Sequence, residues 1–284
     1  MENFILYKEP QINNPYLIIG FKGWPDAGKV ASGAINYLKN KLKAEKFAEI
    51  RAEEFYVFTS SRPLTNIKEG KVQELEFPSN QFFFWKNESS TPDLILLIGT
   101  EPDLKWNKYV KLLMEVIQKF MVKKIFTFGG VYANIPYSKE VITIVTNIKD
   151  LHLKEILRKY EMETGEYQGP AGIHTLLLTE CTKKGIDILS LWGNAPSYIG
   201  GIWNLKVSYA LLKKFLKILN LKVDLEDLKK KSEELNKQID KIIEQKPELK
   251  EYVKKLEEEY ELKRPPHQDE LIKEIENFLK KHKN

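Results

Sequence analysis

The chain has 284 residues, of which 45 are Lys or Arg and 40 are Asp or Glu, giving a net charge of +5. This near balance argues against a nucleic-acid partner, and no apolar run reaches the roughly 18 residues of a membrane span. The single cysteine, Cys181, and four histidines argue against disulfides and a metal site. We therefore expect a cytoplasmic protein with no membrane partner and no cofactor.

Apolar runs and amphipathic stretches alternate along the first 223 residues. We predict strands at 16–21, 55–58, 72–77, 81–85, 93–99, 124–128 and 186–192, and helices at 26–43, 105–120, 172–183 and 205–219. The three segments between 55 and 85 lack an intervening helix, so we expect them to be antiparallel. The remaining strands are nearly continuous apolar runs separated by helices, which is typical of a parallel sheet covered on both faces. The predicted fold class is α/β, a three-layer α/β/α domain over residues 1–223.

Residues 224–284 differ from the rest of the chain, because more than half are charged and none is glycine. Apolar residues spaced seven apart predict a coiled-coil-like seam, formed by Leu228, Leu235, Ile242, Leu249 and Leu256. Pro247 interrupts the pattern, so we expect two helices folded into a hairpin, followed by a terminal amphipathic helix. The seam either packs on the protein's own core or forms an oligomer or partner interface.

The segment from Gly23 to Val30 nearly matches a phosphate-binding loop, with glycine, four residues, glycine and lysine. Three residues depart from that motif. Val30 replaces the magnesium-binding hydroxyl, Asp26 places a carboxylate in the loop, and Pro25 has no amide hydrogen to donate. We therefore interpret the segment as a strand-to-helix turn in which Asp26 caps the helix.

Several other polar residues follow predicted strands or begin a predicted helix. Because the carboxyl ends of parallel strands meet at one edge of a sheet, these residues predict a ligand crevice. It would comprise Gly23, Asp26, Glu101, Tyr132 and His174. One hypothesis is therefore a small-molecule binder or enzyme that takes a nucleoside, nucleotide or carboxylate. No pattern identifies a nucleophile or a base, so no catalytic residue is assigned and we do not predict an enzyme.

Four motifs occur in a characteristic order along the chain. They are Gly20 to Gly28, Gly129 to Tyr132, Gly169 to Gly172, and Ala195 to Tyr198 ahead of the helix at 205–219. Together, over roughly residues 4–228, the chain resembles the proteasome assembly chaperone 2 family, which has archaeal and bacterial members.

This resemblance implies a fold similar to nucleoside phosphorylases, without their catalytic residues, and a homo-oligomer. It also implies a non-enzymatic assembly factor that assists proteasome core-particle assembly by binding α subunits. Archaeal members that dock into α-ring pockets end in a hydrophobic residue, a tyrosine and any residue. This sequence ends in His282, Lys283 and Asn284. We therefore expect the helical extension to be the binding surface instead.

Overall fold

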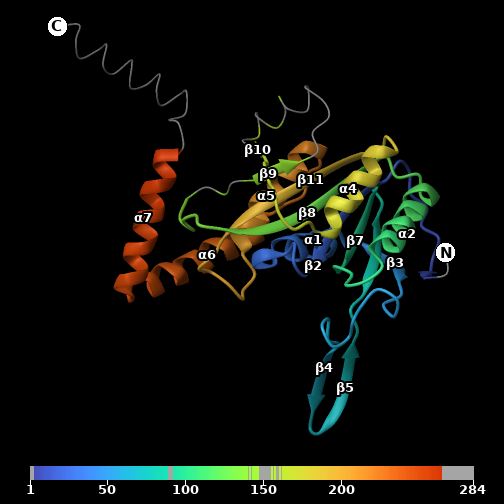
Figure 1. Ribbon diagram of the computed structural model, residues 1–284, viewed down its shortest axis with the longest axis horizontal. Coiled ribbons are helices and arrows are strands. Elements are labelled where there is room, and N and C mark those ends of the chain that lie inside the picture. Colours follow the sequence, from blue (N-terminus) through green and yellow to red (C-terminus); the bar gives the residue numbers. More distant parts are fainter. Residues whose placement is uncertain are drawn as a thin grey trace, which may run out of the picture.

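The computed structural model describes residues 3–88, 92–139, 141, 143–146, 155, 157, 160 and 162–263. Its centre is a nine-stranded mixed sheet with the order β1-β3-β6-β7-β2-β8-β11-β9-β10 (Figure 1). The strands are β1 Phe4–Leu6, β2 Tyr16–Lys22, β3 Glu45–Ile50, β6 Asn80–Trp85, β7 Leu94–Thr100, β8 Lys124–Ala133, β9 Thr143–Thr146, β10 Met162–Thr164 and β11 Asp187–Pro196. The four central strands, β7, β2, β8 and β11, are parallel.

Helices cover both faces of the sheet. Strand β2 shows why, because its successive side chains point to opposite faces. Leu17 and Ile19 pack in one core with α2 Trp106–Lys119 and α4 Ile173–Lys183. Ile18 packs in a second core with α1 Val30–Leu42 and α5 Leu205–Leu219. The predicted α/β/α layering is therefore confirmed.

The predicted elements agree with the structure for most of the central sheet. One prediction was wrong, because residues 55–58 form turns and not a strand. The Phe55 amide donates to the Ala52 carbonyl at 2.9 Å, and the Phe55 side chain is buried against Tyr109. Phe55 and Tyr56 are buried because their side chains fill the core beneath a loop. Apolar content alone does not distinguish such a loop from a strand.

Residues 64–76 form a separate two-stranded ribbon, made of β4 Leu64–Lys68 and β5 Lys71–Glu76. Figure 1 shows this ribbon projecting away from the main sheet. Glu69 and Gly70 connect the strands with φ angles of 51° and 71°. Two successive positive φ angles are typical of the tight turn that matches the twist of a hairpin.

The C-terminal part of the described chain contains α6 Glu226–Glu244 and α7 Pro247–Lys263. Leu225 and Leu228 join the core on the α5 side of the sheet. Pro247 begins the second helix, as expected for a proline in a first turn. The predicted terminal helix after Pro265 and Pro266 lies outside the described residues. The division of the chain after residue 223 stays a prediction.

Candidate functional site

The turn between β2 and α1 contains the near match to a phosphate-binding loop. Gly23 and Gly28 adopt φ angles of 113° and 60°, a region that favours glycine. The Asp26 carboxylate accepts hydrogen bonds from the Ser32 amide at 3.0 Å and from the Ser32 hydroxyl at 2.5 Å. Burial raises the pKa of Asp26 to about 6, although the bonds from Ser32 oppose this change. The helix α1 begins at Val30 and not at Asp26 as predicted, with Lys29 as its N-cap residue. The Asp26 carboxylate nevertheless accepts from a free amide in the first turn of α1, which is the contact that the capping interpretation expected.

Glu101 follows β7 and caps a different helix. Its Oε1 atom accepts a hydrogen bond from the Ile173 amide at 2.8 Å, at the start of α4. Burial is the main cause of its raised pKa, and the hydrogen bond from Ile173 opposes it. A Cβ atom added to Gly23 would lie 3.4 Å from the Glu101 Cβ atom, and one added to Gly172 would lie 3.0 Å from Oε1. The Glu101 side chain thus lies close to two glycines, where larger residues would crowd it.

His174 lies next to this cap but is buried in the core. Its ring packs between Phe21 and Trp192, with centroid distances of 5.5 and 5.6 Å. Neither ring nitrogen has a hydrogen-bond partner among the described residues. Burial lowers the pKa of His174 to about 4, so the ring is neutral at physiological pH.

The predicted crevice residues therefore have different surroundings. Gly23, Glu101 and the start of α4 lie together, whereas Asp26 faces α1 and His174 faces the core. Tyr132 is 46% exposed on β8. Among the described residues no group of three His, Cys, Asp or Glu side chains could hold a metal ion, and no helix is long and apolar enough to cross a membrane. The carboxylates Asp26 and Glu101 serve as helix caps, so the geometry assigns neither of them a reaction.

A second polar region joins the helical extension to the loop that follows β8. The Tyr137 hydroxyl donates to Asp240 of α6, Ser138 donates to Glu257 of α7, and Lys139 pairs with Glu261. Loop residues 137–139 thus contact both helices. In Figure 1, α7 rises away from the end of α6 instead of lying back along it as the predicted hairpin would.

Lys206 of α5 holds this loop in place. Its ammonium group donates to the Tyr137 carbonyl at 2.6 Å and to the Lys139 carbonyl at 2.7 Å. The Tyr198 hydroxyl, from the segment after β11, accepts from the Tyr137 amide at 2.8 Å, and its ring packs edge-on against Tyr252 of α7. The extension therefore docks over the carboxyl ends of β8 and β11 within the same chain.

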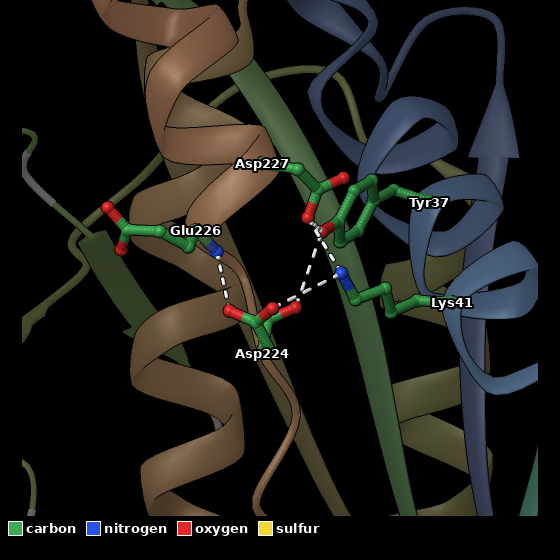
Figure 2. Close-up of polar contacts among 5 residues, drawn as sticks. All are labelled: Tyr37, Lys41, Asp224, Glu226 and Asp227. Carbon is green, nitrogen blue, oxygen red and sulfur yellow. Dashed lines mark hydrogen bonds and ion pairs between the residues drawn. The ribbon is translucent and has the colours of Figure 1, made fainter.

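Figure 2 shows the polar contacts at the start of the extension. Asp227 accepts from the Tyr37 hydroxyl at 2.6 Å and pairs with Lys41 at 2.7 Å, so two residues of α1 hold the first turn of α6. The hydrogen bonds from Lys41 and Tyr37 lower the pKa of Asp227 to about 2. Asp224 lies 3.7 Å from Lys41 and accepts from the Glu226 amide at 2.9 Å. The start of the extension is therefore tied to α1.

The residues of the predicted seam are unequally exposed. Leu228 and Leu256 are buried, Leu235 and Leu249 are half-buried, and Ile242 is 50% exposed. Leu235 also lines a small cavity beneath α6, next to the loop after β8. Whether the exposed part of the seam serves as an interface stays a prediction.

Comparisons with known proteins agree with this architecture. The model of the PAC2 family matches residues 20–243. The chain belongs to the PAC2 family. A proteasome-assembly chaperone homologue from Mycobacterium tuberculosis is 28% identical, with a TM-score of 0.75, and the match covers 84% of this chain and 99% of that chain.

Two archaeal proteins are also similar. PbaB of Pyrococcus furiosus, an archaeal proteasome activator, shares the fold with a TM-score of 0.67 and 24% identity, over 84% of this chain and 97% of that chain. An uncharacterized protein of Methanocaldococcus jannaschii is 25% identical over 78% of this chain and 81% of its own length. The family match extends through most of α6, so α6 is part of the region shared with the family.

The contacts that dock the extension were not predicted from the sequence. Tyr137, Ser138 and Lys139 form an ordinary polar loop segment in the sequence, and their partners lie about 100 residues or more away. The nearby motif ending at Tyr198 was the only local signal. It marked the segment after β11 without indicating its contact with α7.

Proposed function

We propose that this protein is a non-enzymatic assembly factor that acts as a homo-oligomer and binds α subunits of the proteasome core particle. The observation that carries this proposal is the likeness to a proteasome-assembly chaperone homologue over 99% of that chain. The use of Asp26 and Glu101 as helix caps is consistent with a binding protein, since a general base needs a carboxylate directed at a substrate.

The proposed docking surface is the outward face of α6 and α7. These helices lie over the carboxyl ends of β8 and β11, and their charged side chains remain in solvent. Lys254 and Lys255, for example, have side chains that are 74% and 66% exposed. Charged helices of this kind suit an electrostatically guided encounter with another protein.

Purified α subunits of the source organism's proteasome test this proposal. The full chain is mixed with them, and complexes are detected by native mass spectrometry. A complex is expected, and the Lys254→Glu/Lys255→Glu variant should bind more weakly than a control with Lys183→Glu on α4. If no complex with α subunits forms, the proposal is rejected. If the two variants bind equally, α7 is not the docking surface.

The alternative, a binder or enzyme for a nucleoside, nucleotide or carboxylate, makes a different prediction. Such a ligand raises the melting temperature by mass action, and Glu101→Gln or His174→Phe should abolish the increase. The buried, unpaired ring of His174 is the observation that favours it. A thermal-shift series with these compounds therefore distinguishes the two functions.

A further inference from the structure

The helical extension is attached to the rest of the chain at two separate places. At the first, Leu225 and Leu228 belong to the core on the α5 side of the sheet, and Asp227 is held by two residues of α1 (Figure 2). The second is the loop after β8, residues 137–139, which contacts α6 and α7. The start of α6 is therefore fixed to the core, whereas the rest of the extension depends on the loop.

Beyond the first attachment, the buried apolar side chains of the extension belong to neither of the two cores. They are Ile243 of α6 and Val253, Leu256 and Tyr260 of α7. In Figure 1, α7 projects from the body of the molecule instead of lying along it. A segment that packs separately from the core can open separately from global unfolding.

The second attachment is made of polar contacts. Three consecutive residues of the loop each contact one carboxylate of the extension. The pairs are Tyr137 with Asp240, Ser138 with Glu257, and Lys139 with Glu261. The Lys139 and Glu261 side chains are 34% and 61% exposed, and exposed ion pairs contribute little to stability. Hydrogen bonds from a hydroxyl to an ionised carboxylate are stronger, so Tyr137 and Ser138 should provide most of this attachment.

The packing beneath α6 is incomplete. A cavity of about 20 Å³ is lined by Leu235 and Ile239 of α6 and by Val207 of α5. Asn194 of β11 lines the same cavity, and its Oδ1 atom is buried with no hydrogen-bond partner among the described residues. Atoms beside a void lose contacts, and a buried acceptor without a donor destabilises the state that contains it. Both effects lower the cost of lifting α6 away from the sheet.

We propose that the extension is a strap that opens while the rest of the chain stays folded. The first turn of α6 is its hinge, and loop residues 137–139 are its latch. When the latch is released, α6 leaves the cavity and water reaches Val207 and Asn194. The strap thus determines whether the apolar surface at the carboxyl ends of β8 and β11 is covered. The movement needs no partner, so it is independent of proteasome binding.

The distance between hinge and latch makes a small rotation sufficient. Asp240 follows Asp227 by 13 residues along α6, which corresponds to about 20 Å of helix. A rotation of roughly 15° at the hinge would move Asp240 by about 5 Å, which exceeds the reach of its hydrogen bond from Tyr137. The hinge contacts of Asp227 can therefore persist while the latch is broken.

Thiol labelling of the purified full-length chain tests the proposal. Val207→Cys places a thiol beneath α6, and the native Cys181 reports on global unfolding, because these positions are 2% and 0% exposed. N-ethylmaleimide modifies a buried thiol only when it becomes exposed, and peptide mass spectrometry separates the two sites. The introduced thiol should react at least roughly tenfold faster than Cys181. Its rate should also depend less on urea, because opening exposes less surface than unfolding.

The latch is tested by adding Tyr137→Phe/Ser138→Ala to the Val207→Cys chain. Loss of two hydrogen bonds to carboxylates should speed the reaction of the introduced thiol by at least about tenfold. The matched control, Tyr167→Phe/Ser61→Ala, removes the same atoms from residues that bond elsewhere, to the Pro170 carbonyl and to Asp103. The control should leave the reaction rate unchanged.

Amide hydrogen exchange of the chain without the introduced thiol gives a second measurement. Exchange should be faster in α7 than in β2, and the latch variant should speed it further in α7. Equal labelling rates with equal urea dependence for the two thiols would overturn the proposal. Equal protection of α7 and β2, an unchanged rate in the latch variant, or the same increase in the control would do so too.

Discussion

Leu228 and Ile242 provide a matched test of how the extension is held, since both belong to the same seven-residue spacing on α6. Leu228 is 1% exposed in a core that includes Phe215 and Leu216, whereas Ile242 is 50% exposed. Truncating a buried leucine to alanine costs about 2–5 kcal/mol. Truncating a half-exposed isoleucine should cost about 1 kcal/mol or less. We therefore expect Leu228→Ala to be much more destabilising than Ile242→Ala.

Urea unfolding, followed in parallel by circular dichroism and tryptophan fluorescence, measures this difference. All five tryptophans precede residue 204, so fluorescence reports on the core and circular dichroism also reports on α6 and α7. The two signals should change together if α6 is part of one cooperative unit. Equal destabilisation by the two substitutions, with midpoints that rise with protein concentration, would show that the seam is buried between subunits and refute this reasoning.

Three further predictions follow from the polar contacts. Asp26 has a pKa of about 6 in the folded chain against 3.8 as its ordinary value. The stability of the wild type should therefore fall by about 3 kcal/mol relative to Asp26→Asn as the pH rises from about 3 to about 7, and parallel slopes in pH-dependent unfolding would contradict this. Glu101→Ala should cost about 1–2 kcal/mol by removing the cap of α4, measured by thermal unfolding, with a loss below 0.5 kcal/mol as the contrary result. Lys206→Met should speed amide hydrogen exchange in α7, because the Tyr137 and Lys139 carbonyls lose their donor; unchanged exchange would show that the loop holds α7 without it.

Much of the fold could be predicted because local patterns matched the final environment. The helix at 205–219 was predicted with both of its bounds, since its apolar residues repeat at helical spacing. The structure adds that Asn204 caps this helix by accepting from the Val207 amide at 3.1 Å. The capping role of Asp26 was also predicted, from its position between a strand and a helix. Both features depend on residues that are neighbours in the sequence.

The missed elements have weaker local signals. Strand β3 contains three charged residues in six, Glu45, Lys46 and Glu49, so its sequence does not indicate burial. It is a strand because it pairs with both β1 and β6. The same reasoning applies to β4, whose residues are all exposed and which pairs only with β5. Hydrogen bonding to a neighbouring strand, and not local apolar content, decides such strands.

The sequence by itself determined the class of the fold, the turn after β2 and the helical character of the extension, because hydrophobic periodicity and backbone preferences act over a few residues. Only the tertiary structure decided that Glu101 accepts from the first amide of α4, how the loop after β8 meets α6 and α7, and that the β4–β5 ribbon projects with exposed apolar side chains. These features depend on contacts between residues far apart in the chain. Their energies arise only when the elements have packed together.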